Sequence, residues 1–187
     1  MKTIRTVIFA ALVILAACSP AATSQEDFTG YVNVRIGSGG HGHVFVGASV
    51  PFGAVQLGPT SIPQSWDWCS GYHSSDSTVI GFSHTHLSGT GIGDLFDITL
   101  MPVVGAVRYS RGEEPKDSTP EAIAAAQVTG MWSYADRTRE VARPGYYSVP
   151  LTRYGITAEM TATTRVGLSR YTFPASRPRP SPSPAPP

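Results

Sequence analysis

Residues 145–173 read GYYSVPLTRYGITAEMTATTRVGLSRYTF, a pattern typical of antiparallel β-structure. From Ile156 to Thr163, apolar and polar side chains alternate, which predicts a strand with one buried face. Residues 146–151 are β-prone, and residues 166–173 are predicted to pair with the alternating strand. Gly167 predicts a bulge or a bend near the start of this last strand. The stretch therefore predicts a small antiparallel sheet.

The composition of the whole chain points to the same fold class. The 187 residues include 19 Gly and 16 Pro but only 14% charged residues, which suits sheets joined by many turns better than helices. The length allows one domain with a core of its own. Further strands are expected at residues 44–46, 54–57, 79–84 and 96–104, a loop at 86–94 and a short capped helix at 118–127. We expect an all-β fold, mainly an antiparallel β-sandwich with one short helix, over residues 28–173.

The N-terminus resembles an export signal. A basic start is followed by an apolar run at residues 7–15 that is too short to cross a bilayer. The run ends in Leu-Ala-Ala-Cys, which resembles the lipobox of bacterial lipoproteins and predicts cleavage of residues 1–17, with lipid on Cys18. Residues 18–27 are then a tether, and the protein is a periplasmic or outer-membrane lipoprotein of a bacterial cell envelope. The alternative is an ordinary signal peptide in which Cys18 is incidental.

The C-terminus has a different character. Residues 174–187 read PASRPRPSPSPAPP, a segment that does not pair in a sheet or pack in a core, so we expect a disordered tail. One interpretation is a genuine tail. The hypothesis favoured here is that the coding frame was lost after Phe173, so that the chain is truncated.

The residues most suggestive of a binding site lie between Trp66 and Asp94, which read WDWCSGYHSSDSTVIGFSHTHLSGTGIGD. Aromatic rings, Asp, His and Ser occur there with almost no Lys or Glu, which suits a polar, uncharged partner such as a sugar. In residues 66–72 aromatic rings flank Asp67, whose carboxylate accepts from hydroxyl groups. The alternative is that Trp66, Trp68 and Tyr72 are core residues. Cys69 has no partner for an intrachain disulfide if Cys18 is lipidated.

Other chemistries find less support. His41-x-His43 and His84-x-His86 could each chelate Zn²⁺ on an extended strand, but hydrogen-bonding histidines that line a cleft are the preferred interpretation. The Gly-rich run at 37–43 lacks nucleotide-binding spacing. The 14 Lys and Arg balance 13 Asp and Glu, so nothing suggests a nucleic-acid partner. In and near residues 66–94 the candidates for catalytic carboxyl groups are Asp67, Asp94 and Asp97, and no pair of them is compelling as a glycosidase dyad.

Three long blocks carry a family resemblance. YVNVRIGSGGHGHVFVGASVPFGAVQLGPT, WDWCSGYHSSDSTVIGFSHTHLSGTGIGDLFDITLMPVVG and PGYYSVPL…YGITAEMTATTRVGLSRYTFP strongly resemble the N-terminal domain of glycoside hydrolase family 92, the bacterial α-mannosidases. The resemblance covers residues 31–173. It implies exo-acting, inverting, calcium-dependent enzymes of N-glycan or mannan degradation, in which a β-sandwich meets a larger (α/α)₆ barrel. The catalytic acid, the base and the Ca²⁺ ligands then belong to the barrel.

For this chain the resemblance implies one wall of a pocket for an α-mannoside glycan. The expected pocket or interface residues are Phe52, Trp66, Asp67, Cys69 and His84. No catalytic residue and no metal ligand is expected in the chain itself. The resemblance also implies apolar surface that faces the missing (α/α)₆ barrel, and hence poor solubility in isolation. One departure from the family is Val34-Arg35, where the family tends to have Pro-Phe.

Three functional hypotheses follow. The first is a truncated, lipid-anchored N-terminal domain of an α-1,2-mannosidase-like enzyme that is inactive alone. The second is a free-standing mannoside-binding lipoprotein module that uses the loop at 66–72. The third is a periplasmic metal-binding β-protein that uses the His pairs.

Overall fold

The computed structural model of the chain describes residues 26–89, 91–105 and 130–175. This part is mainly antiparallel β-structure, as predicted, and its helical elements are the short 3₁₀ helices η1 (Phe28–Tyr31) and η2 (Trp66–Trp68). No helix in the described ranges has the length and apolar character needed to cross a membrane. The predicted signal peptide, the lipidation at Cys18, most of the tether, the helix at 118–127 and the tail from residue 176 lie outside the described residues.

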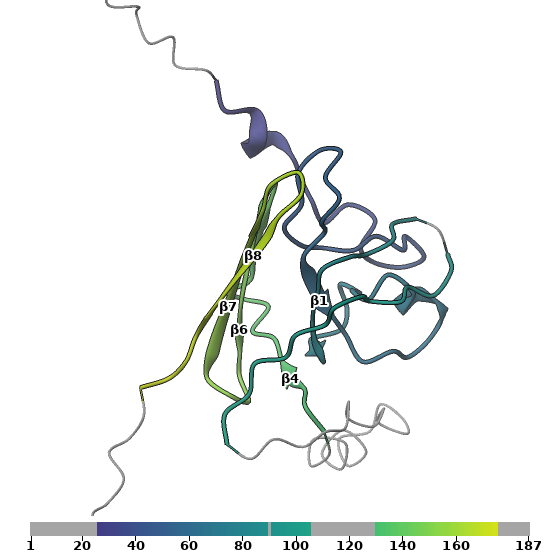
Figure 1. Ribbon diagram of the computed structural model, residues 1–187. Coiled ribbons are helices and arrows are strands. Elements are labelled where there is room, and N and C mark those ends of the chain that lie inside the picture. The colour runs from purple at the N-terminus through teal and green to yellow at the C-terminus, as the bar shows by residue number, and fades with distance from the viewer. Residues whose placement is uncertain (1–25, 90, 106–129, 176–187) are drawn as a thin grey trace, which may run out of the picture.

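One regular sheet forms the first layer of the fold. Its strands are β5 (Val141–Arg143), β6 (Tyr146–Leu151), β7 (Ile156–Ala162) and β8 (Gly167–Thr172), antiparallel and in that order (Figure 1). Buried and partly exposed residues alternate along β6 and over most of β7, because successive side chains point to opposite faces. The strands predicted at 146–151, 156–163 and 166–173 are confirmed.

Gly167 has a different role from the one predicted. It lies directly opposite Ala162 in the regular register of β7 and β8, so the prediction of a bulge or bend there is wrong. A Cβ at this position would lie 2.2 Å from Leu57 Cδ1. The residue is glycine because the side chain of Leu57 packs directly against its backbone.

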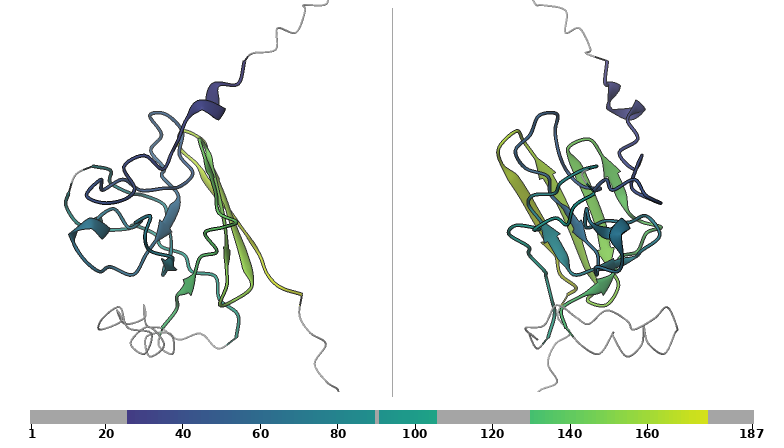
Figure 2. Two further views of the ribbon diagram at one scale, coloured as in Figure 1. Left: turned by 180° about the vertical axis from the view of Figure 1, so that it is seen from behind. Right: turned by 90° about the vertical axis from the view of Figure 1, so that its right-hand side faces the viewer.

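The second layer is largely irregular and lies against one face of the sheet (Figure 2). It contains two strand pairs, β1 (Gly58–Thr60) with β3 (Gly81–Ser83) and β2 (Thr78–Val79) with β4 (Ser133–Tyr134). The strand predicted at 79–84 thus corresponds to β2 and β3, with an interruption at Ile80. The described residues of the predicted loop at 86–94 contain no strand or helix.

Three predicted strands are wrong. Residues 44–46 are not in a strand, and the runs at 54–57 and 96–104 contribute only the isolated bridges of Leu57 with Ala48 and of Leu100 with Phe82. Phe96 and Ile98 have φ angles of 52° and 53°, in the left-handed region, which breaks the extended geometry that a ladder needs.

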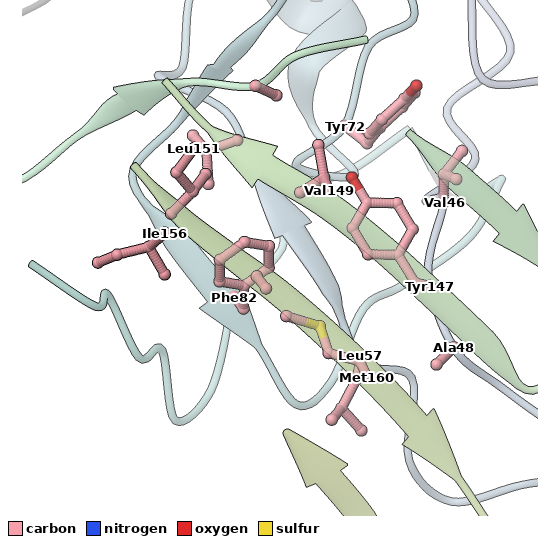
Figure 3. Close-up of a cluster of buried hydrophobic side chains, with 13 residues drawn as sticks. Val46, Ala48, Leu57, Tyr72, Phe82, Tyr147, Val149, Leu151, Ile156 and Met160 are labelled. Carbon is pink, nitrogen blue, oxygen red and sulfur yellow. The ribbon is translucent and has the colours of Figure 1, made fainter. Parts of the chain in front are cut away.

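The hydrophobic core lies between the two layers (Figure 3). Side chains from the inner face of β6 and β7 meet side chains from the irregular layer, and burial of this apolar surface is the main force that holds the irregular segments in place. The core consists of Val46, Ala48, Leu57, Tyr72, Val79, Phe82, Ala135, Tyr147, Val149, Leu151, Ile156, Ala158 and Met160.

A buried ion network joins the layers at one edge of this core. The Glu140 side chain is 1% exposed and pairs with Arg35 at 2.6 Å and with Arg137. Tyr147 and Tyr72 also donate to it, at 2.5 and 3.3 Å. Burial alone would raise the pKa of the Glu140 carboxyl, but the charge of Arg137 and the hydrogen bonds from Tyr147 and Arg35 outweigh it and hold the pKa below its ordinary value.

Candidate functional site

Residues 66–72, the segment predicted to bind a ligand, contain η2 and form one side of a groove. The groove has a volume of about 490 Å³, and its lining is mostly apolar. The Asp94 N–H donates to the Cys69 carbonyl oxygen at 3.1 Å and so ties the two sides together. The lining residues are Pro63, Ser65, Trp66, Trp68, Cys69, Ile80, Gly93, Asp94, Leu95 and Phe96.

The three aromatic residues of this segment have different environments. Tyr72 is 2% exposed and belongs to the core. The indole N–H of Trp68 donates to Asp76 Oδ2 at 2.7 Å, and its ring stacks on His73 at 4.2 Å. Trp66 is 63% exposed. Of the three rings, Trp66 is therefore the one free to offer a face to a ligand.

Asp67 lies next to Trp66 and is held by two histidines. His41 Nδ1 lies 2.8 Å and His43 Nε2 lies 3.1 Å from the same carboxylate oxygen, Asp67 Oδ1. The hydrogen bond from His41 is the largest of the effects that hold the pKa of the Asp67 carboxyl below its ordinary value. Within the described ranges, Asp67 Oδ2 has no hydrogen-bond partner. One oxygen is thus committed and the other is available as an acceptor.

His43 links this carboxylate to the exposed ring. Its imidazole is 12% exposed and lies edge-on to the Trp66 ring, with 5.7 Å between centroids. A Cβ at Gly91 would come within 3.0 Å of Trp66 and 3.5 Å of His43, so the backbone of residue 91 packs against both rings. His43 thus contacts both an exposed aromatic ring and a carboxylate, two kinds of group that suit hydroxylated ligands.

The structure favours hydrogen bonding over metal binding for the histidine pairs. His84 Nδ1 lies 3.0 Å from the Ile98 carbonyl oxygen, and His86 Nδ1 lies 2.9 Å from that of Gln56. Burial lowers the pKa of His86, so this imidazole is neutral at neutral pH and donates from Nδ1. In the part of the chain that the structure describes, no group of three or more His, Cys, Asp or Glu side chains could hold a metal ion.

The described carboxylates also do not fit the calcium ion that the family resemblance implies. Ca²⁺ takes six to eight oxygen ligands. Both oxygens of Asp94 accept backbone N–H groups, from Leu87 at 2.6 Å and from Phe96 at 3.2 Å, and Asp67 Oδ1 is taken by imidazoles. No step of a reaction is therefore assigned to a metal ion on these residues.

Three of the five predicted site residues lie together, and two lie elsewhere. Trp66 and Cys69 line the groove, and Asp67 adjoins it. Phe52 is fully exposed in the turn at residues 50–53, with a φ of 57°. His84 follows β3 and bonds the backbone at Ile98, and neither Phe52 nor His84 lines the groove.

Sequence reasoning did not connect His41 and His43 to Asp67. Both histidines stood out as a pair, but the carboxylate they hold is 24 to 26 residues away in the chain. The contribution of Leu95 and Phe96 to the groove was also missed, and Phe96 was predicted to begin the strand at 96–104. The sequence feature that could have indicated the contact between the histidines and Asp67 is the Gly-rich run at 37–43, because glycines allow the tight turns that bring distant segments together.

Comparisons with known proteins agree on one family. Residues 31–181 match the glycosyl hydrolase family 92 N-terminal domain. A family 92 α-mannosidase from Bacteroides thetaiotaomicron, solved with mannoimidazole, is 40% identical, with a TM-score of 0.68 over 80% of this chain and 18% of that one. The family 92 glycosyl hydrolase ccman5 is 28% identical, with a TM-score of 0.62 over 80% of this chain and 19% of that one.

A protein of Arthroderma benhamiae, named an uncharacterized secreted glycosidase, is 31% identical over 155 residues, which is 82% of this chain and 18% of that protein. The chain therefore spans less than a fifth of the length of the relatives it matches.

Proposed function

Because this chain belongs to the glycosyl hydrolase family 92 N-terminal domain family, we propose that it supplies part of the mannose-binding pocket of an inverting α-mannosidase. The observation that carries the proposal is the exposed Trp66 ring beside Asp67, whose Oδ2 has no partner in the described part of the chain. A solved family 92 relative at 40% identity is an α-mannosidase that binds mannoimidazole. The substrate class is an α-1,2-linked mannoside of an N-glycan or a mannan.

The chemistry of the surface around η2 suits this substrate. A sugar ring has an apolar C–H face that packs on an indole, and hydroxyl groups that donate to a carboxylate. The Asp67 carboxyl, whose pKa is lowered by hydrogen bonds from His41 and His43, is ionised at neutral pH and acts as an acceptor. An aromatic ring and one carboxylate are sufficient to bind and orient an uncharged sugar, so no additional charged side chain is required.

Catalysis is assigned to another part of the enzyme. In the described residues, Asp94 is occupied by backbone N–H groups and Asp67 by imidazoles, so neither is placed as a proton donor to a leaving group. The relatives are about five times as long as the matched region. We infer that an (α/α)₆ domain with its Ca²⁺ completes the pocket and that this chain is inactive alone.

The proposed location is the cell envelope. The run that ends at Cys18 has the form of a lipobox, and the Arthroderma benhamiae relative is named as secreted. The proposed membrane attachment is lipid on Cys18. We expect palmitate labelling of the protein in cells and loss of the label in Cys18→Ser, and a Cys18→Ser variant that keeps its label would contradict the anchor.

A titration of the full chain with α-1,2-mannobiose tests the pocket. Half a pocket predicts millimolar binding, seen as a shift of the Trp66 indole N–H resonance in NMR spectra but without measurable heat in calorimetry at sub-millimolar ligand. Trp66→Ala should abolish shifts elsewhere in the groove. Phe173→Ala is a matched control, because this exposed aromatic lies after β8 and outside the groove. The absence of any mannobiose-dependent shift would refute the proposal.

A free-standing mannoside-binding module is the second candidate. The observation that favours it is that Trp66, Asp67 and both histidines are already assembled within this one chain. A module of this kind predicts measurable heat with mannobiose at sub-millimolar concentration. Calorimetry therefore separates the two candidates.

A further inference from the structure

His43 has a strained backbone conformation that neighbouring hydrogen bonds hold in place. Its φ of 54° lies in the left-handed region, which residues with a Cβ rarely adopt. Its carbonyl oxygen accepts from the Gly89 N–H and from Ser70 Oγ, each at 2.6 Å. Strain of this kind persists only where the surroundings fix it, and it is found preferentially at functional positions.

The side chain of His43 shows what this conformation achieves. It places Nε2 3.1 Å from Asp67 Oδ1 and the ring edge-on to Trp66. His41 reaches the same oxygen at 2.8 Å from the solvent side, since its side chain is almost fully exposed. Two donors on one oxygen fix the rotation of the carboxylate, and Asp67 Oδ2 is left without a partner among the described residues.

We propose that His43, assisted by His41, is a positioning residue that holds the Asp67 carboxylate beside the Trp66 ring. In this position Asp67 Oδ2 accepts a hydrogen bond from a hydroxyl group of the bound sugar. The choice of a sugar as ligand rests on the proposed function, whereas the positioning of Asp67 does not. The left-handed backbone conformation at His43 allows its imidazole to donate to the Asp67 carboxylate and to pack against the Trp66 indole at the same time. His43 acts through Asp67 and does not itself contact the sugar.

A pair of glycine substitutions separates this role from simple structural strain. Glycine adopts positive φ without penalty, so His43→Gly and Ile98→Gly each relieve the same kind of strain and should leave the unfolding midpoint unchanged or raise it. Ile98 is the matched control, because its side chain is exposed and its carbonyl contact with His84 needs no side chain.

The first readout needs no ligand. Carboxyl ¹³C titration by NMR should show that the pKa of Asp67 rises part of the way toward its ordinary value in His43→Gly, because the larger effect of His41 remains, and that it stays low in Ile98→Gly and the wild type. His43→Gln should restore part of the effect, since the Gln amide nitrogen reaches about as far as His43 Nε2 and donates to a carboxylate. An Asp67 pKa that His43→Gly leaves unchanged would overturn the positioning role, whatever the ligand is.

The second readout is the mannobiose titration of the full chain. His43→Gly should weaken binding by about tenfold, as expected for loss of an oriented acceptor, and Ile98→Gly should not. Equal affinity of His43→Gly and wild type would overturn the role in sugar binding while leaving the proposed function intact. A wild type that binds no mannobiose would instead overturn the proposed function, and with it the assignment of a sugar to Asp67 Oδ2.

Discussion

At the scale of single residues, glycines allow segments of the irregular layer to pack closely against one another and against the sheet. A Cβ at Gly47 would lie 2.0 Å from the Leu57 carbonyl oxygen, and one at Gly42 would lie 2.0 Å from that of Gly37. Separations below 3.0 Å are essentially never seen for real Cβ atoms, so these approaches are closed to every other residue. At Gly42 and Gly47, glycine is therefore a packing requirement.

Gly167 gives the cleanest test of this packing at one position. In Gly167→Ala the new methyl group would meet Leu57 Cδ1 at 2.2 Å, and Leu57 cannot move aside because it is 1% exposed within the core. We expect a loss of about 1–3 kcal/mol in the free energy of unfolding, measured by urea denaturation. Gly30→Ala is the control, because nothing lies within 4 Å of its Cβ position. Equal stabilities of the two variants would contradict the close contact.

The candidate site shows at this scale what a sequence does and does not reveal. Trp66 and Asp67 were predicted from a local run of rings and a carboxylate, and this part of the pattern is visible in seven residues. The imidazoles that hold Asp67 come from a separate loop 24 to 26 residues earlier. Local pattern carries no information on such a pairing, because it depends on how two irregular segments fold back on each other.

At the scale of elements, the same limit separates the correctly predicted strands from the missed ones. β6 and β7 alternate between buried and less buried residues over six and seven positions, and this period of two was readable in advance. The short strands β1 to β4 contain two or three residues each, too few for a period to appear. Apolar runs at 44–46 and 96–104 were mistaken for strands, because burial in an irregular segment (44–46) and an exposed apolar surface (96–104) select the same residue types as a strand.

The Glu140 network is the strongest link between elements outside the apolar core. It joins the loop at Arg35 to Tyr72, to Arg137 and to Tyr147 on β6. Arg35 is one of the positions where the sequence departs from the family pattern, and its charge is met by Glu140 at 2.6 Å. The departure is therefore accommodated by a buried partner.

Replacement of Glu140 should be costly at neutral pH and less so in acid. Glu140→Gln leaves the partly buried guanidinium group of Arg137 and the more exposed one of Arg35 without their counter-charge at a buried position, so we expect a loss of about 3 kcal/mol in the free energy of unfolding at pH 7. The pKa of this carboxyl in the folded protein lies below the ordinary value of 4.5, so its contribution is complete above pH 4.5 and is lost as the pH falls through the lower, folded value. The difference between wild type and variant should therefore shrink in acid.

Urea denaturation of both proteins between pH 7 and pH 3 measures this difference. Glu159→Gln is the matched control, since Glu159 pairs with Arg170 at 2.7 Å on the outer face of the sheet. Exposed pairs contribute about 0–1 kcal/mol, so this variant should lie close to the wild type. A Glu140→Gln difference that stays constant with pH would show that the network is not ionised as described.

At the scale of the whole molecule, exposed large apolar side chains gather in two segments of the described chain, at residues 28–36 and at residues 87–104. Between residues 87 and 104, the large apolar side chains that are exposed are Leu87, Ile92, Leu95, Ile98, Leu100 and Val104. This apolar ridge continues from the groove at Leu95, where the exposed Trp66 adds to it. Exposed apolar side chains concentrated in one segment are typical of an interaction site. The proposed (α/α)₆ partner would cover it.

Without such a partner, the apolar ridge should drive self-association of the isolated chain. Leu95 and Ile98 are 83% and 71% exposed, so Leu95→Lys and Ile98→Lys remove apolar surface without opening the core. We expect both variants to lower the apparent mass in light scattering while the melting temperature changes by no more than a few degrees. Leu168→Lys is the control, because Leu168 is equally apolar and 65% exposed but lies on the outer face of the sheet. If all three lysine variants reduced association alike, general solubility would be the cause and the apolar ridge would lose its special role. A wild-type chain that is monodisperse and melts cooperatively would remove the need for a covering partner altogether.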